Sequence, residues 1–149
     1  DGNDQDARED MFPSKVAVYN DNRLLGTSKT TAESNFDAAH PLYAEIAKLS
    51  AIRRATPALS RGRQVTRAYD EKPGLFAVSR FDPVTGAEVL IAFNTSTAPI
   101  TRQVEVGVGS TAFTALVGQC MPEAAAPGSL TVRIAPLGYV ACAVAGGAK

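Results

Sequence analysis

The sequence predicts a mainly β protein, an antiparallel Greek-key β-sandwich that follows a helical segment. One strong helical pattern occurs in the first 61 of the 149 residues. From Gly62 onward, short apolar runs alternate with turn residues and no helical pattern lies between them, which is typical of an antiparallel sandwich. One late run alternates cleanly, with Leu130, Val132 and Ile134 separated by polar residues, as expected for a strand with one buried face.

A helix is predicted over residues 41–55. Leu42, Ile46 and Leu49 recur at spacings of four and three residues, which places them on one helical face. A proline stands at the first helical position, where its missing N–H group costs nothing, and Pro57 is expected to end the helix. We expect the apolar stripe to be partly buried against the sandwich, because an uncovered stripe would promote aggregation or dimerisation.

Seven strands are predicted after the helix. They cover residues 64–69, 75–81, 88–94, 102–106, 113–117, 130–134 and 139–144. The second and third should form a hairpin, because the loop that joins them contains the turn formers proline and glycine. The third strand carries apolar side chains on both faces, which indicates a central position in its sheet.

The charge balance excludes several classes of function. Lysines and arginines number 15, and so do aspartates and glutamates. A nucleic-acid partner would require a basic footprint, and a membrane-surface helix would require a lysine-rich face, so neither partner is expected. No glycine-rich dinucleotide or phosphate-binding motif is present in the sequence, so nucleotide binding has no support.

Two cysteines, Cys120 and Cys142, lack the paired spacing and the neighbouring histidines of a zinc site. Cys142 lies in an apolar strand, where cysteine behaves as a small hydrophobic residue. Two free thiols are therefore the favoured interpretation. A single disulfide is the alternative if the protein is exported, because disulfides depend on the redox compartment.

Two further residues carry motifs with ordinary explanations. His40 is the only histidine and hence the only candidate base for a nucleophilic triad, but no nucleophile motif accompanies it, so a polar residue flanking a helix is favoured. Asn94-Thr95-Ser96 matches a glycosylation acceptor. Such triplets are common, and an ordinary strand exit is favoured here.

The first twelve residues, DGNDQDAREDMF, form an acidic cluster around Arg8. The calcium loop of an EF-hand requires glycine at its sixth position and glutamate at its twelfth, and these positions hold Asp6 and Phe12. The segment therefore does not match an EF-hand. An irregular calcium site is the alternative, because the segment is rich in side chains with oxygen ligands. The arginine should keep the acids ionised, which suits binding better than acid–base catalysis.

These features together resemble the end of an α-amylase-type enzyme of glycoside hydrolase family 13. The opening segment looks like the G-D-x-D-x-x-x-R stretch that follows the last barrel strand in many members. Residues 40–62 are similar to the last barrel helix, with the ending Pro57-Ala58-Leu59 and Gly62. The segments GLFAVSRF and VLIAFNTS look like the first hairpin of the family's C-terminal β-sandwich, called domain C.

The resemblance implies a division of the chain and a parent enzyme. Residues 1–61 would be the C-terminal remnant of a (β/α)8 catalytic barrel, with a loop and the last helix, and residues 62–149 the sandwich. The parent would hydrolyse α-glucans such as starch with retention, using carboxylates on earlier barrel strands. A barrel takes about 250 residues, so we expect most of the protein to lie upstream of Asp1 and no catalytic residue to lie in this chain. The chain alone should be structural and without hydrolytic activity.

The resemblance also implies one sugar contact. Asp4 and Arg8 match a D-x-x-x-R pair that hydrogen-bonds glucose on the non-reducing side of the scissile bond in some members. Carboxylate accepts hydrogen bonds from sugar hydroxyls and guanidinium donates to them. An ion pair that shapes the loop is the alternative, and Gln5-Asp6 departs from the Pro-Asp of many members.

The remaining expectations concern ligands, partners and location. No cofactor and no metal are expected in this chain, whereas the parent is of a class that can bind calcium. Its partners would be the α-glucan, reached through the parent enzyme, and the rest of the catalytic barrel. A periplasmic or extracellular location is favoured over the cytoplasm. The alternative function is a non-catalytic carbohydrate-binding β-sandwich module, against which the sequence offers few aromatic residues and no tryptophan.

Overall fold

The computed structural model describes residues 11–21 and 24–146. The chain forms two compact units, residues 1–51, here called the N-terminal unit, and residues 52–149, here called the β-domain. The sequence pattern predicted that the β-sandwich begins at Gly62. The structural boundary falls earlier because the short helix α2 (Pro57–Arg61) packs on strands of the β-domain.

The N-terminal unit is held mainly by loop contacts. A short 3-10 helix, η1 (Ala17–Asp21), is followed by an irregular segment. Thr31 is only 2% exposed, and its hydroxyl donates a hydrogen bond to the Tyr19 carbonyl at 2.7 Å. The rings of Phe12 and Phe36 meet edge to face with centroids 4.9 Å apart.

Helix α1 (Pro41–Ala55) has the predicted bounds. The expected packing of its apolar stripe against the sandwich stays a prediction. No α1 residue is buried, and Leu42, Ile46 and Leu49 are 49%, 65% and 37% exposed. The helix ends at Ala55, before Pro57, as predicted, and Pro57 has a second role. It begins α2 after Thr56, the residue that precedes the first turn, since proline suits a first helical position as well as a helix end.

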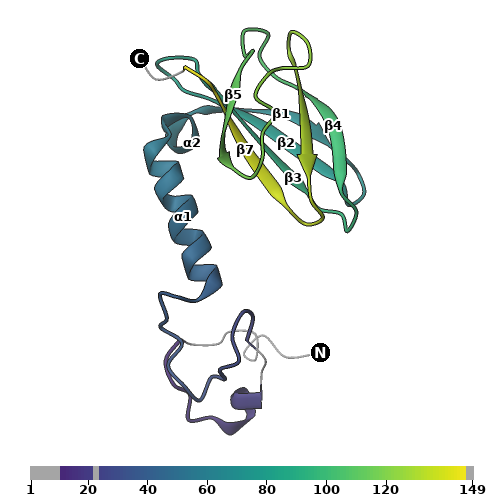
Figure 1. Ribbon diagram of the computed structural model, residues 1–149. Helices are drawn as coiled ribbons and strands as arrows, with labels where there is room; N and C mark the ends of the chain where they lie inside the picture. The colour runs from purple at the N-terminus through teal and green to yellow at the C-terminus, as the bar shows by residue number, and fades with distance from the viewer. Residues whose placement is uncertain (1–10, 22–23, 147–149) are drawn as a thin grey trace. The chain divides into compact units, whose positions relative to one another are not determined.

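The β-domain contains two antiparallel sheets, visible in Figure 1. Its strands are β1 (Arg63–Tyr69), β2 (Leu75–Phe81), β3 (Glu88–Asn94), β4 (Ile100–Glu105), β5 (Phe113–Val117), β6 (Ser129–Ile134) and β7 (Tyr139–Val144). One sheet has the strand order β1-β2-β3-β7-β5 and the other pairs β4 with β6. The predicted sandwich is confirmed, and so are the β2–β3 hairpin and the central position of β3.

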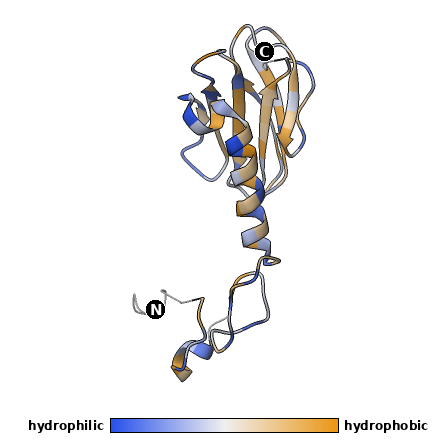
Figure 2. Ribbon diagram, turned by 90° about the vertical axis from the view of Figure 1, so that its left-hand side faces the viewer, coloured by the Kyte–Doolittle hydropathy of each residue, from blue (hydrophilic) through white to orange (hydrophobic). Residues whose placement is uncertain are grey.

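The core lies between the two sheets. Leu75 and Leu90 from the five-stranded sheet and Leu130 from β6 are 1% exposed or less. Apolar residues are concentrated in the strands, as Figure 2 shows. Every second side chain of each sheet thus fills the core between the sheets, as the alternation of apolar and polar residues predicts. Among the described residues, no helix is long and apolar enough to cross a membrane.

Candidate functional site

The predicted sugar contacts Asp4 and Arg8 lie outside the described residues, as does the acidic cluster considered as an irregular calcium site. In the part of the chain that the structure does describe, no group of three or more His, Cys, Asp or Glu side chains is arranged to hold a metal ion. The candidate features are therefore the buried polar groups and the exposed surfaces of residues 11–21 and 24–146.

His40 is the N-terminal cap of α1. Its carbonyl accepts the Ala44 N–H at 2.9 Å, and its ring Nδ1 lies 3.2 Å from the Leu42 nitrogen, whose N–H it accepts. Since Nδ1 is an acceptor, the ring hydrogen lies on Nε2, which donates to the Leu25 carbonyl at 2.9 Å. One ring nitrogen thus caps the helix and the other binds the preceding loop, which supports the helix-flanking interpretation over a catalytic base.

Asn94 closes one end of the core and is not positioned as a glycosylation acceptor. It is 2% exposed. Its side-chain amide donates to the carbonyls of Ala98 at 2.7 Å and Ala135 at 3.0 Å, and its oxygen accepts from Ser96. These bonds, here called the Asn94 clamp, join the end of β3 to the chain leaving β6.

Glu88 closes the other end of the core, and both its oxygens are saturated. The Ser79 hydroxyl donates a short hydrogen bond to Oε1. On Oε2, the carboxylate accepts the Gly107 N–H at 2.7 Å and the Ser110 hydroxyl at 2.6 Å. The side chain is 0% exposed and is paired with Arg67 at 3.1 Å, so the buried charge is both hydrogen-bonded and compensated.

Arg67 connects this carboxylate to the second sheet. A bulge shifts the β1 register between Thr66 and Ala68, and bulges re-aim side chains. From there Arg67 donates to the Ser79 hydroxyl at 2.8 Å and to Glu105 of β4 at 2.8 Å. We call the group formed by Glu88, Arg67, Ser79, Ser110 and Glu105 the Glu88 clamp.

Asp82 organises the β2–β3 turn. Its carboxylate accepts the backbone N–H groups of Thr85 at 3.0 Å and Val84 at 2.7 Å. These hydrogen bonds lower the pKa of Asp82 below its usual value of 3.8, and the charge of Arg61 adds to the effect. Gly86, with φ of 73°, supplies the left-handed residue that ends the turn.

The stability of the β-domain should fall in acid partly through Asp82. Because folding lowers its pKa, the ionised carboxylate stabilises the fold above about pH 4, and this contribution is lost as the pH falls through the lowered value. Asp82→Asn keeps an oxygen acceptor that does not titrate. In urea unfolding, the stability difference between the two proteins should be constant near neutrality and should shrink below about pH 4. A difference that stays constant in acid would contradict this role.

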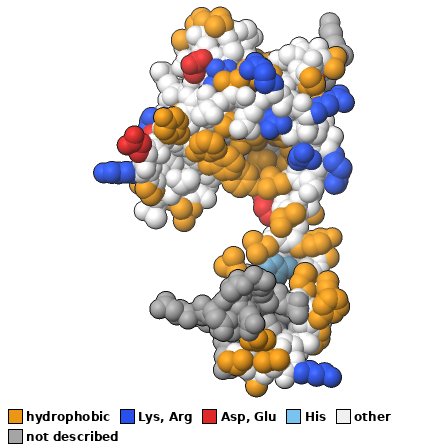
Figure 3. Space-filling view, turned by 180° about the vertical axis from the view of Figure 1, so that it is seen from behind, with side chains coloured by type: hydrophobic (Ala, Val, Ile, Leu, Met, Phe, Trp, Pro, Cys, Tyr) orange, Lys and Arg blue, Asp and Glu red, His pale blue; other side chains and the backbone are white. Residues whose placement is uncertain are grey.

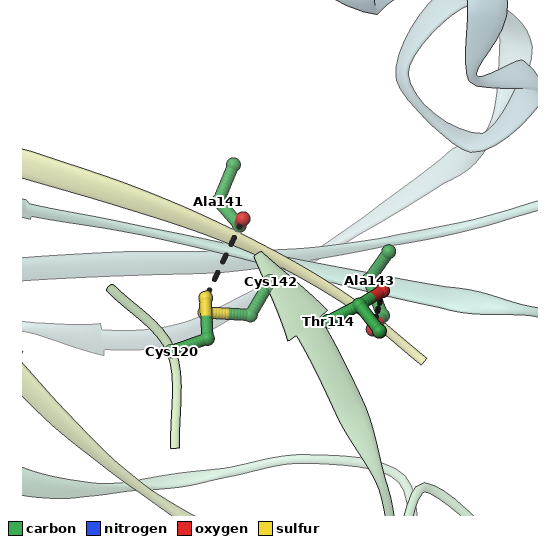
Figure 4. Close-up of a disulfide and its surroundings, with 5 residues drawn as sticks. All are labelled: Thr114, Cys120, Ala141, Cys142 and Ala143. Carbon is green, nitrogen blue, oxygen red and sulfur yellow. Dashed lines mark hydrogen bonds between the residues drawn. A yellow bond between two sulfur atoms is a disulfide. The ribbon is translucent and has the colours of Figure 1, made fainter. Parts of the chain in front are cut away.

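The prediction of two free thiols is wrong. Cys120 and Cys142 form a disulfide, and Figure 4 shows the bond with Cys120 Sγ 3.5 Å from the Ala141 carbonyl oxygen. Cys142 is 1% exposed and belongs to the core. The apolar setting that favoured a free thiol is therefore real, but the loop after β5 brings a second cysteine to it.

The outer face of the five-stranded sheet carries a row of four aromatic side chains, here called the aromatic row. In the strand register Tyr69 is opposite Phe76, Phe76 is opposite Phe93, and Phe93 is opposite Tyr139. Residues directly opposite one another point to the same side of a sheet. Their neighbours Ala77 and Ala92 are 0% exposed and face the core, so the row faces outward. Sequence reasoning missed it because the pairing is not visible in a single strand.

The N-terminal unit has an apolar hollow of about 410 Å³. Leu25, Leu42, Tyr43 and Ile46 contribute its apolar wall, and His40 lies at its edge. The α1 residues of the predicted stripe therefore line a surface depression within this unit.

Neither of the two buried acids among the described residues is arranged as the general acid of a glycoside hydrolase. Such an enzyme needs one acid with a raised pKa and a second one about 5–10 Å away, on opposite sides of a sugar. The two buried acids are Glu88 and Asp82. The first has its oxygens filled by four partners, and the pKa of the second is lowered.

Comparison with known proteins identifies relatives of the whole chain. No family model matches it. The chain is 36% identical over 146 residues to an alpha-amylase of Streptomyces lividans, and the match covers 97% of this chain but 16% of that enzyme. This chain therefore spans only a small part of its relative's length.

Solved structures show the same fold. AmyP in complex with maltose matches with a TM-score of 0.58 and 18% identity, over 78% of this chain and 25% of that one. A debranching enzyme of Nostoc punctiforme matches with a TM-score of 0.54 and 19% identity, over 70% of this chain and 20% of that one. A mutant of trehalulose synthase MutB matches with a TM-score of 0.53 and 24% identity, over 79% of this chain and 20% of that one.

The two antiparallel sheets define the class of this domain as a β-sandwich, and the solved structures share this fold. More particularly, the chain is an α-amylase homologue and is related to glycoside hydrolase family 13. The resemblance read from the sequence is thereby confirmed.

Proposed function

We propose that this chain is the non-catalytic end of an α-amylase-type glycoside hydrolase that acts on α-glucans such as starch and maltooligosaccharides. The observation that carries the proposal is the match to alpha-amylase along 97% of this chain and only 16% of that enzyme. The commitment of the buried acids Glu88 and Asp82 to structural bonds supports it. In this role Asp4 and Arg8 would contact glucose in the parent enzyme.

The physical role that we assign is to cover apolar surface of the catalytic barrel and to stabilise the whole enzyme. The exposed α1 side chains support this assignment, since Leu42 and Ile46 are 49% and 65% exposed and line an apolar hollow. Monomeric proteins rarely leave contiguous apolar surface of this kind uncovered.

A location outside the cytoplasm belongs to the same proposal. The Cys120–Cys142 disulfide supports it, because disulfides persist in the periplasm and the extracellular space and are rare in the cytosol. Calcium binding is assigned to the parent rather than to this chain.

The direct test is turnover by the chain itself. Maltoheptaose and soluble starch are incubated with the purified chain, and new reducing ends are measured against a buffer blank and an active α-amylase. We expect no release above the blank, because the buried acids Glu88 and Asp82 are committed to structural hydrogen bonds. Turnover that persists through purification and follows the chain's concentration would overturn the proposal.

A further inference from the structure

We propose that the aromatic row on the outer face of the five-stranded sheet binds a segment of α-glucan chain, outside any catalytic centre. The choice of an α-glucan rests on the proposed function. The existence of the binding surface rests on the geometry of Tyr69, Phe76, Phe93 and Tyr139.

The first argument is that the row is continuous across four adjacent strands. The rings of Phe76 and Phe93 have centroids 6.1 Å apart and planes inclined by 24°. Those of Phe93 and Tyr139 are 5.9 Å apart and inclined by 28°. Near-parallel rings in contact at such distances must be offset sideways, because carbon atoms in direct stacking lie about 3.5–4 Å apart. Each ring therefore leaves part of its face uncovered by its neighbour.

The second argument is exposure. Tyr69 is 73% exposed, Phe76 40% and Phe93 37%, although phenylalanine on a central strand is ordinarily buried. Figure 3 shows hydrophobic side chains gathered over one side of the β-domain. Exposed apolar surface of this kind marks interaction sites, and the row provides the aromatic lining that small-molecule and sugar sites use.

The third argument is charge and polarity, which select the occupant. The row holds no ionisable group that is charged at neutral pH, and Asp70, which follows Tyr69, is paired with Arg102 at 3.4 Å. An uncharged ligand therefore complements it better than an anion or a basic peptide. The pyranose ring has an apolar C–H face and a rim of hydroxyls. The row matches this arrangement, with two phenylalanines in the middle and the Tyr69 hydroxyl at one end.

The experiment is calorimetric titration of the chain with maltoheptaose, with cellohexaose as a second arm. Tyr69→Ala is the main variant, since its highly exposed side chain can be removed without opening the core. Val84→Ala is the control, an exposed apolar side chain of the β2–β3 turn (80%) outside the row. Circular dichroism melting establishes that each variant is folded.

We expect wild type and Val84→Ala to bind maltoheptaose equally, and Tyr69→Ala to bind roughly five- to tenfold more weakly, the loss expected for one aromatic contact. Phe93→Ala, if folded, should weaken binding further. Absence of maltoheptaose binding, or equal affinity of the Tyr69 variant, would overturn the inference. Equal or tighter binding of cellohexaose would overturn the assignment to α-glucans. None of these results depends on turnover, so the proposed function would stand or fall separately.

Discussion

Replacing Glu88 by alanine should destabilise the β-domain by about 3–5 kcal/mol, the range measured when one partner of a buried ion pair is removed. The change leaves Arg67, whose side chain is 10% exposed, without its buried partner. It also leaves the hydroxyls of Ser79 and Ser110 and the N–H of Gly107 without their acceptor. Each buried polar group left unpaired adds about 1–3 kcal/mol of cost, so the loss is large for one side chain.

The measurement is urea unfolding followed by far-ultraviolet circular dichroism, compared with two variants. Glu88→Gln keeps the shape and one acceptor but not the charge, and its loss should be intermediate. Glu33→Ala removes an exposed carboxylate from the N-terminal unit and should leave the stability of the β-domain within about 0.5 kcal/mol of wild type. If Glu88→Ala is as stable as wild type, the Glu88 clamp makes no net contribution to the free energy of unfolding.

Removing the Cys120–Cys142 disulfide should cost about 3 kcal/mol. The bond joins residues separated by 22 positions, and closing a loop of that size removes roughly this much conformational freedom, expressed as free energy, from the unfolded chain. For a domain of this size such a loss lowers the melting temperature by roughly 10–20 °C. The measurement is thermal unfolding of the oxidised protein with and without a thiol reductant.

A double variant, Cys120→Ala with Cys142→Ala, separates the cross-link from the packing of the sulfur atoms. It should melt near the reduced wild type and should not respond to the reductant. If the reductant leaves the wild-type melting temperature unchanged while free thiols become titratable, the cross-link does not stabilise the domain and this prediction is wrong.

Local pattern was sufficient for most of the secondary structure. The helix at residues 41–55 and the strands at 75–81, 88–94, 113–117 and 139–144 have the predicted bounds. These segments combine a clear apolar period with proline or glycine at their ends, so that propensity and pattern agree. At β4 the strand begins at Ile100, two residues before the prediction. Shifts of one or two residues are expected at the ends of elements, because those ends are defined only to that precision.

The errors all concern contacts between segments distant in sequence. A single strand does not show that Phe76 and Phe93 are opposite one another, nor that two of the few aromatic residues lie outside the core. From the sequence alone, Glu88 looks like an exposed polar residue at the start of a strand. Only the folded structure shows that Ser110 and Arg67 bind its buried carboxylate. The sugar contacts Asp4 and Arg8 remain predictions.

The two clamps also have a kinetic consequence. The Arg67–Glu105 bond joins residues 38 positions apart, and the Asn94–Ala135 bond joins residues 41 apart. Contacts of such separation form after the hairpins they connect, because long loops must close first. Bonds absent from the transition state slow unfolding without speeding folding. The unfolding rate of Glu88→Ala should therefore rise far more than its folding rate falls. The clamps thus determine the lifetime of the folded state.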